Sequence, residues 1–262
     1  MSGEQIDDTG NHVAVSGPVR RVVSLVPSLT ESLAATAPWS LVGATAWCTH
    51  PRSLDVVRVR GTKNPDLDRI LDLEPDLVLA NAEENRPEDL AALRAAGVPV
   101  WVTDIRTLPQ ALHSLHRMVT VCGYPRPTWL DHAFRVWQDV LAGVPAPREH
   151  AVVPIWRRPW MVLGSDTFAG DVLARLGIAN LYATAEARYP KVSLAELNAG
   201  GADVVVLPDE PYAFAGNDGP ECFPALPAAL VSGRHLTWYG PSLGTARDVL
   251  TRQLAQRIPA PG

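Results

Sequence analysis

Short apolar runs alternate with segments that begin like helices, and this alternation is the feature that most constrains the fold. Residues 21–26, 41–45, 77–80 and 98–103 are short, apolar and often β-branched, as strands are. Helices are predicted after each run, at residues 28–37, from 64 onward, 87–96 and 107–121. Strands joined by helices indicate a mostly parallel sheet of the α/β class.

The predicted helix starts rest on capping signals. Ser28–Glu31, Thr107–Gln110 and Ser193–Glu196 match the capping box, in which the first and fourth side chains bond each other's backbone N–H groups. Asn64 and Asn85 are predicted as further N-caps, because each stands shortly before a proline that can occupy the first helical turn.

The pattern restarts in the second half of the chain. Residues 129–141 carry apolar side chains at helical spacing, and prolines end this helix. Strands are predicted at 152–156, 160–163, 204–207 and 236–238, and helices at 164–176, from 193 onward and at 242–258. We predict an N-terminal α/β lobe of residues 1–122, a connecting helix within 123–146 and a C-terminal α/β lobe of residues 147–262.

The two halves resemble each other. "LDRILDLEPDLVLANAEE" (67–84) can be laid on "LAELNAGGADVVVLPDE" (194–210), which places Asp76 on Asp203 and Glu83 on Glu210. "VPSLTESLAATA" (26–37) likewise resembles "LGSDTFAGDVLARLG" (163–177). Two weak matches in the same order predict two similar lobes bridged by one long helix.

Charge and hydropathy exclude several classes of partner. The chain has 23 basic and 28 acidic residues, a net charge of −5 and no basic block, so no nucleic-acid partner is predicted. No apolar run approaches the roughly 20 residues of a membrane span. The opening residues, MSGEQIDDTGNHVAVSG, lack a basic and apolar leader, so a cytoplasmic location is predicted for the chain as written. Cys48, Cys122 and Cys222 are scattered and predict free thiols.

Function is expected in the loops that leave the carboxyl ends of the strands, in a cleft between the lobes. These loops are rich in aromatic, basic and acidic residues, which suits a large, partly apolar ligand with polar groups. The predicted ligand-binding residues are Trp47, Lys63, Asn64, Glu83, Glu84, Asn85, Arg86, Arg157, Arg158, Trp160, Glu210, Trp238 and Tyr239.

Several motifs carry a family resemblance. "RVVSLVPSLTESLAA", "GTKNPDLDRILDLEPDLVLAN" and "KVSLAEL…ADVVVL" resemble the periplasmic-binding family that captures cobalamin, ferric siderophores and haem for ABC importers. The resemblance implies two lobes with a ligand held between them and no intrinsic cofactor. It implies cobalamin or a related corrinoid as ligand, with a ferric siderophore or haem next. It also implies that Asp68 and Glu196 dock on arginines of an importer permease, although acids in a first helical turn also offset the helix dipole.

Other interpretations stay open for the same residues. The chain has no Walker loop, GxGxxG, GxSxG or HExxH motif, so no catalytic residue is predicted and the chain is not expected to be an enzyme. His113 and His116 have a legal metal-ligand spacing but lack a third ligand, so no metal site is predicted. The alternatives are a cytosolic, chelatase-like enzyme that uses Glu83, Glu84 and Glu210, and a cytosolic ligand sensor.

Overall fold

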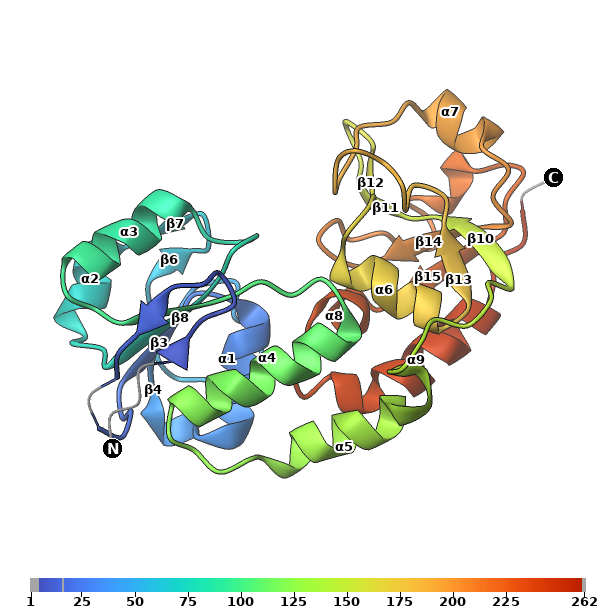
Figure 1. Ribbon diagram of the computed structural model, residues 1–262. Coiled ribbons are helices and arrows are strands. Elements are labelled where there is room, and N and C mark those ends of the chain that lie inside the picture. Colours follow the sequence, from blue (N-terminus) through green and yellow to red (C-terminus); the bar gives the residue numbers. More distant parts are fainter. Residues whose placement is uncertain (1–4, 16, 261–262) are drawn as a thin grey trace. The chain divides into compact units, whose positions relative to one another are not determined.

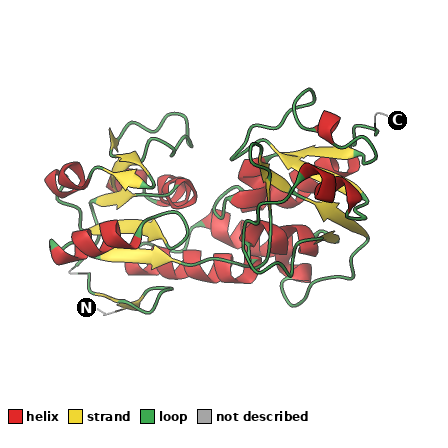
Figure 2. Cartoon of the chain, turned by 90° about the horizontal axis from the view of Figure 1, so that it is seen from above, coloured by secondary structure: helices red, strands yellow, loops and turns green. Residues whose placement is uncertain are grey.

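The computed structural model describes residues 5–15 and 17–260, which fall into two compact units. Unit 1 comprises residues up to Asp104, Leu112–His132 and Tyr239–Pro241, and unit 2 comprises Ile105–Ala111, Ala133–Trp238 and the residues from Ser242. Helices α4 (Leu108–Val121) and α5 (Thr128–Trp137) contribute to both units, so the boundaries predicted at residues 122 and 146 remain a proposal. Each unit holds a parallel sheet with helices beside it (Figures 1 and 2), which confirms the predicted α/β class.

Unit 1 is built on a five-stranded parallel sheet. Its strands lie in the order β5 (Val57–Arg58), β4 (Leu41–Ala44), β3 (Val22–Ser24), β8 (Leu77–Asn81) and β9 (Val100–Thr103). The remaining elements of this unit are the antiparallel pairs β1 (Gln5–Ile6) with β2 (His12–Val13) and β6 (Arg60–Gly61) with β7 (Asn64–Pro65), the helices α1 (Pro27–Thr36), α2 (Leu67–Asp72) and α3 (Pro87–Ala95), and the 3-10 turn η1 (Pro38–Ser40).

Unit 2 is built on a four-stranded parallel sheet. Its strands lie in the order β13 (Ile178–Asn180), β10 (Glu149–Val152), β14 (Val204–Pro208) and β15 (Ala228–Val231). The remaining elements are the antiparallel hairpin β11 (Pro154–Trp156) with β12 (Met161–Val162), the helices α6 (Phe168–Arg175), α7 (Leu194–Ala199), α8 (Gly233–Thr237) and α9 (Leu243–Ala255), and the 3-10 turns η2 (Gln138–Val140) and η3 (Pro220–Cys222).

The internal repeat is confirmed by the strand order and by one pair of hydrogen bonds. The order β4-β3-β8-β9 in unit 1 corresponds to β13-β10-β14-β15 in unit 2. Ahead of β8, the Asp76 N–H donates to the Arg21 carbonyl at 2.8 Å, and the Arg21 N–H donates back to the Asp76 carboxylate at 2.9 Å. Ahead of β14, Asp203 and His150 make the same exchange at 2.8 and 2.7 Å. The sequence alignment therefore placed structurally equivalent residues on each other.

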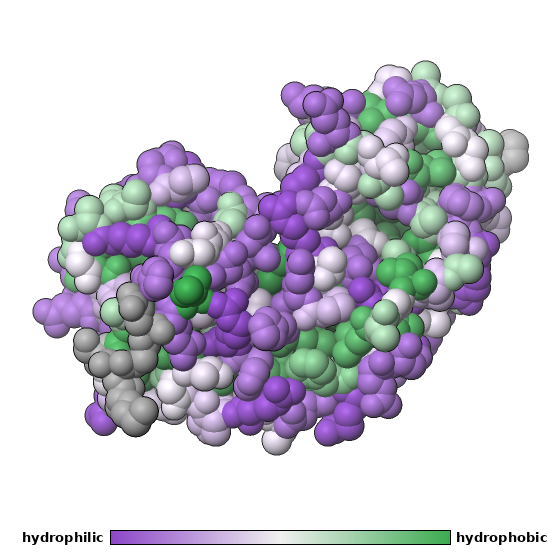
Figure 3. All heavy atoms as spheres, viewed as in Figure 1, coloured by the Kyte–Doolittle hydropathy of each residue, from purple (hydrophilic) through white to green (hydrophobic). Residues whose placement is uncertain are grey.

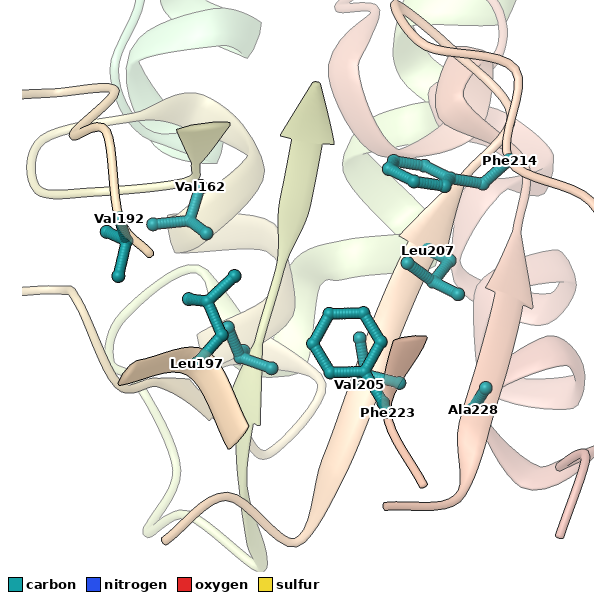
Figure 4. Close-up of a cluster of buried hydrophobic side chains, with 9 residues drawn as sticks. Val162, Val192, Leu197, Val205, Leu207, Phe214, Phe223 and Ala228 are labelled. Atoms are coloured by element: carbon teal, nitrogen blue, oxygen red, sulfur yellow. The ribbon is translucent and has the colours of Figure 1, made fainter. Parts of the chain in front are cut away.

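A hydrophobic core cluster of unit 2 lies on one face of its sheet (Figure 4). Val205 and Leu207 point to this face because side chains two residues apart on a strand share a side. The buried side chains shown come from β10, β12, the residues around α7, β14, β15 and the long loop between the last two strands; they are Val152, Val162, Val192, Leu197, Val205, Leu207, Phe214, Phe223 and Ala228. Each large side chain that is fully removed from water contributes about 1.5–3 kcal/mol.

Hydrophilic residues predominate on the face shown in Figure 3, with apolar residues in smaller patches. Among the described residues, no helix is both long and apolar enough to cross a bilayer.

One predicted capping box appears in full, and a second appears only through the bond made by its N-cap side chain. The Thr107 hydroxyl accepts from the Gln110 N–H at 3.3 Å, and the Gln110 side chain accepts from the Thr107 N–H at 3.1 Å. Ser193 caps α7 by accepting from the Glu196 N–H at 3.2 Å. The third box is wrong, because α1 begins at Pro27 and Ser28 lies within its first turn.

Two further local predictions are wrong. Asn64 lies in β7 rather than at a helix start, and Asp66 caps α2 by accepting from the Arg69 N–H. Residues 236–238 do not form a strand, because Leu236 and Thr237 belong to the short helix α8.

The reciprocal hydrogen bonds between Asp76 and Arg21 give a stability prediction. Asp76→Ala removes the acceptor of two backbone N–H groups, Arg20 at 2.7 Å and Arg21 at 2.9 Å. We expect the free energy of unfolding of unit 1 to fall by about 1–2 kcal/mol, the lower part of the range for bonds to a charged group, because Asp76 is exposed. Urea unfolding measures the change. Asp72→Ala, an exposed acid on α2, is the control and should change the value by no more than about 0.5 kcal/mol. Equal effects of the two substitutions would refute the role of the exchange.

Candidate functional site

At the carboxyl edge of the unit 1 sheet, the loop after β4 presents an exposed indole. The Trp47 side chain is 67% exposed. The loop is held against hairpin β6–β7, since the Ala46 N–H donates to the Arg60 carbonyl at 2.7 Å. The indole packs beside Gly61, where a Cβ atom would lie 3.4 Å from Trp47 Nε1 and only 2.5 Å from Asn64 Oδ1. Trp47 is thus a large apolar surface held on an ordered support.

The turn after β8 is held by two asparagines. Asn81 Oδ1 accepts from the N–H groups of Glu83 at 2.9 Å and Glu84 at 3.2 Å, which shapes the turn. The Asn85 side chain accepts from the Asn81 N–H at 2.9 Å and donates to the Thr62 carbonyl at 3.0 Å. Asn85 is 2% exposed and ties β8 to the hairpin. The predicted N-cap role of Asn85 is wrong, because Arg86 occupies the N-cap position of α3.

Basic residues near this turn already have partners. Lys63 Nζ donates to the Glu83 carbonyl at 2.6 Å. The Arg86 guanidinium binds the Asp89 carboxylate through two bonds of 2.9 and 3.0 Å and lies 3.6 Å from Glu88. Arg86 therefore stabilises its own helix. Asn64 is exposed on β7.

The structure brings the unit 1 candidates together at one edge. Bonds between the β4 loop, the β6–β7 hairpin and the β8 turn place these residues on neighbouring segments, namely Trp47, Lys63, Asn64, Glu83, Glu84 and Asn85. Cys48 lies beneath this edge. Burial raises the pKa of its thiol, and the nearby Glu84 charge adds a smaller rise, while hydrogen bonds with Thr30 and Thr45 oppose the rise. A buried, neutral thiol at this place fills space rather than acting as a nucleophile.

In unit 2, Arg157 is bound by acids of its own unit. Its guanidinium pairs with Asp218, lies 2.8 Å from Glu221 and donates to Cys222 Sγ at 3.2 Å. The Tyr212 hydroxyl donates to the other Asp218 oxygen at 2.7 Å. These bonds tie the turn of hairpin β11–β12 to the long loop after β14. Arg158, by contrast, is exposed and has a left-handed backbone with a φ of 71°.

An aromatic cluster lies beside this network. Trp160 stacks on Phe214 with ring centroids 6.1 Å apart and packs edge-on against Phe223. Tyr212 contacts Phe214, and Trp156 meets Tyr212 edge-on at 5.8 Å. Trp160 is therefore a support, whereas Trp156 remains 42% exposed. Trp156 was not among the predicted binding residues, although it shares with Trp47 a position at the end of a strand.

Glu210, Trp238 and Tyr239 are more enclosed than predicted. Trp238 is 8% and Tyr239 is 6% exposed, so neither offers a broad face to a ligand. Among the described residues, the buried Glu210 Oε1 has no hydrogen-bond partner. Burial and, next, the Asp209 carboxylate raise the Glu210 pKa, while Arg234 and the Trp238 N–H oppose the rise. Of the described residues, no three His, Cys, Asp or Glu side chains are grouped to hold a metal ion.

The raised pKa of Glu210 gives a prediction of pH dependence. A carboxyl whose pKa is higher in the folded state loses stabilising free energy as the pH rises through that pKa. Glu210→Gln removes the buried charge. The free energy of unfolding of this variant, compared with that of the wild type at the same pH, should therefore increase from pH 4 to pH 7. This window begins below the ordinary glutamate pKa of about 4.5 and extends above it. Urea unfolding at both pH values measures this difference. Glu186→Gln is an exposed control and should show no such increase.

The two α/β units, with parallel sheets of the same strand order, have the fold of solved periplasmic binding proteins. No family model matches the chain. The vitamin B12-binding protein of Vibrio cholerae serotype O1 is 26% identical over 185 residues, 69% of this chain and 67% of that protein. The vitamin B12-binding protein of Pectobacterium carotovorum is 24% identical over 252 residues, 92% of this chain and 90% of that protein.

Solved structures give the same result. The periplasmic vitamin B12-binding protein of Vibrio cholerae superposes with a TM-score of 0.77 at 22% identity, covering 91% of this chain and 97% of that one. A periplasmic heme-binding protein in complex with two hemes superposes with a TM-score of 0.72 at 26% identity, covering 91% and 98%. These relatives confirm the resemblance to the periplasmic family of cobalamin, siderophore and haem receptors.

The predicted cytoplasmic location is contradicted by these comparisons. The solved neighbours are named as periplasmic binding proteins, and this finding overturns the prediction. The prediction rested on the opening residues of the printed sequence, and these do not decide the compartment.

Proposed function

We propose that the chain is a non-enzymatic receptor for a bulky metal-chelate ligand, with cobalamin or a related corrinoid preferred over a ferric siderophore or haem. The observation that carries the proposal is Trp47, whose indole is 67% exposed at the carboxyl edge of a parallel sheet. Open α/β sheets bind ligands at this edge, and an indole exposed there gains free energy when a flat ligand covers it. The vitamin B12-binding relatives favour the corrinoid.

Each unit supplies an apolar face with a polar rim. In unit 1, Trp47 is the face, and Lys63, Glu83 and Glu84 form the rim. In unit 2, Trp156 is the face, and Arg158 is an exposed guanidinium near it in sequence. A corrinoid suits such surfaces because its ring is broad and its amide side chains both donate and accept hydrogen bonds. The metal is part of the ligand and needs no protein metal centre.

The ligand prediction is tested with cyanocobalamin, hemin and a ferric siderophore. We expect cyanocobalamin to raise the melting temperature most, because a ligand that binds only the folded state stabilises it. Trp47→Ala should weaken binding about tenfold or more, since a covered indole contributes on the order of 1.5–3 kcal/mol. Titration calorimetry measures the dissociation constants.

Trp39→Ala is the matched control. Its indole is 65% exposed, but it lies in η1, ahead of the amino end of β4, and packs edge-on against Tyr124. This substitution should leave binding unchanged. The proposal fails when none of the three ligands shifts the melting temperature, or when the two tryptophan substitutions weaken binding equally.

We further propose that an ABC importer permease is the partner. Asp68, the second residue of α2, and Glu196, the third residue of α7, both lie exposed in the first turn of a helix. Arginines of a permease are suitable partners for such carboxylates.

The docking role predicts that substitution of the two acids impairs stimulation of the importer but not ligand binding. The double substitution Asp68→Ala and Glu196→Ala should leave the dissociation constant for cyanocobalamin unchanged and reduce ligand-stimulated ATPase activity of the reconstituted importer severalfold. Asp72→Ala with Glu186→Ala is a control of equal charge. Full stimulation by the Asp68 and Glu196 variant would contradict the docking role.

The same surfaces support binding better than catalysis. Among the three glutamates that an enzyme would use, Glu210 is largely enclosed by Gly233 and Trp238, and the relatives are binding proteins. Catalysis would need an accessible acid or base beside the bound substrate. We therefore place Glu83 and Glu84 in ligand contact and Glu210 in support of the strand end.

A further inference from the structure

Unit 2 has a cavity at the opposite edge of its sheet from the proposed ligand surface. It has a volume of about 870 Å³ and lies among the end of α6, helix α9 and the segment that enters β10. Arg148 and Gly177 line it and stand immediately ahead of β10 and β13. The cavity is therefore at the amino ends of the strands, whereas Trp156 and Glu210 lie beyond carboxyl ends. Its size is within the range of small-molecule sites.

Four arginines line this cavity, and two of them are rigid parts of its wall. Arg175 binds Asp171 through two bonds of 2.7 and 3.2 Å, and its side chain is 7% exposed. Arg247 binds Asp139 through two bonds of 2.5 and 2.7 Å. These carboxylates neutralise the two guanidinium groups and hold them in place.

The other two arginines keep their charge available. Within residues 5–15 and 17–260, Arg148 and Arg252 form no salt bridge. Arg148 donates to the Leu176 carbonyl at 2.7 Å, and Arg252 donates through Nε to the Asp248 carbonyl at 3.3 Å. A guanidinium has five N–H donors, so several on each remain for a ligand.

Gly177 positions one of these guanidinium groups. A Cβ atom at Gly177 would lie 2.8 Å from Arg148 Nε, and the residue has a φ of +81°, a conformation that favours glycine. The Arg148 N–H also donates to the Gly177 carbonyl at 2.8 Å. The Arg148 fork is thus held flat against the backbone before any ligand arrives, which lowers the entropy lost on binding.

Apolar residues, together with Thr251 and the acid Asp248, make up the rest of the lining. Val140, Pro145 and Leu176 line the large cavity beside the arginines. A smaller pocket of about 310 Å³ shares Arg148 and Leu176 with it and is lined further by Ile178 and Leu254. Arg148 therefore stands where a charged part and an apolar part of one ligand would meet.

We infer that this cavity binds an organic oxyanion, a carboxylate or a phosphate monoester, that carries an apolar chain. The forks of Arg148 and Arg252 bind the oxyanion, because a guanidinium matches two oxygens of either group. The apolar chain of the ligand lies along Leu176 and enters the smaller pocket. The site is independent of the metal-chelate surface and uses none of its residues.

Decanoate and decyl phosphate test the inference in titration calorimetry on the full chain. We expect at least one of them to bind at submillimolar concentration, and decanol and inorganic phosphate each to bind at least tenfold more weakly, because each lacks one of the two recognised parts. Added salt should weaken binding of the anion, since the arginines that bind it are charged and exposed to solvent. Absence of binding by both anions at millimolar concentration, or equal binding of decanol, overturns the inference.

Substitutions locate the site. Arg148→Met and Arg252→Met keep an apolar stem and remove the charge. Each substitution should weaken anion binding about tenfold. Arg252 is exposed and makes a single bond, so its substitution should leave the fold intact. Arg135→Met, exposed on α5 and outside the lining, should leave anion binding unchanged. All three variants should keep the cyanocobalamin response of the wild type. Anion binding unaffected by both Arg148→Met and Arg252→Met overturns the assignment.

Discussion

Parallel pairing of the strands is the constraint on which the rest of the structure depends. In a parallel sheet every strand ends at the same edge, so loops that are distant in sequence become neighbours. The β4 loop with Trp47 and the β8 turn with Glu83 and Glu84 are separated by more than thirty residues, yet both border hairpin β6–β7. The register is fixed at the opposite edge, where Asp76 and Asp203 each exchange hydrogen bonds with the start of the neighbouring strand.

Ion pairing decides which of the candidate residues remain open to a ligand. Arg86 and Arg157 lie near the strand ends, but each is bound by carboxylates of its own unit. An arginine that already binds a carboxylate must lose that bond before it binds another, so it is a poor first contact. Trp47 and Trp156 have no such competitor and expose broad rings. Each of these exposed rings, taken within its own unit, is therefore better suited to contact a flat, partly apolar ligand than a small anion.

The sequence was sufficient for the class of fold because apolar runs and capping residues are local signals. Thr107 and Ser193 cap helices as predicted, and the overlay of Asp76 on Asp203 holds in the bonding pattern. One failure is a residue with a partner that is distant in sequence. Asn85 has the sequence context of an N-cap. Its side-chain amide instead forms hydrogen bonds with Asn81 and with Thr62, and Thr62 is twenty-three residues away. Strands β13 and β15 were missed, whereas β3, β4 and β9, which are equally short and parallel, were predicted from their apolar runs.

The candidate site was harder to predict than the fold, since exposure depends on tertiary packing. Trp160 and Trp238 have the same local signal as Trp47, an aromatic residue at a predicted strand end. Trp160 is covered by Phe214 and Phe223, and Trp238 is 8% exposed beside Glu210. The carboxyl edge of unit 2 thus owes its shape to the long loop after β14, which supplies both Phe214 and Asp218. This loop has no counterpart of equal length in unit 1, where α3 follows the β8 turn directly. The repeat therefore explains the two sheets, and the unequal connections explain why each unit presents a different surface to a ligand.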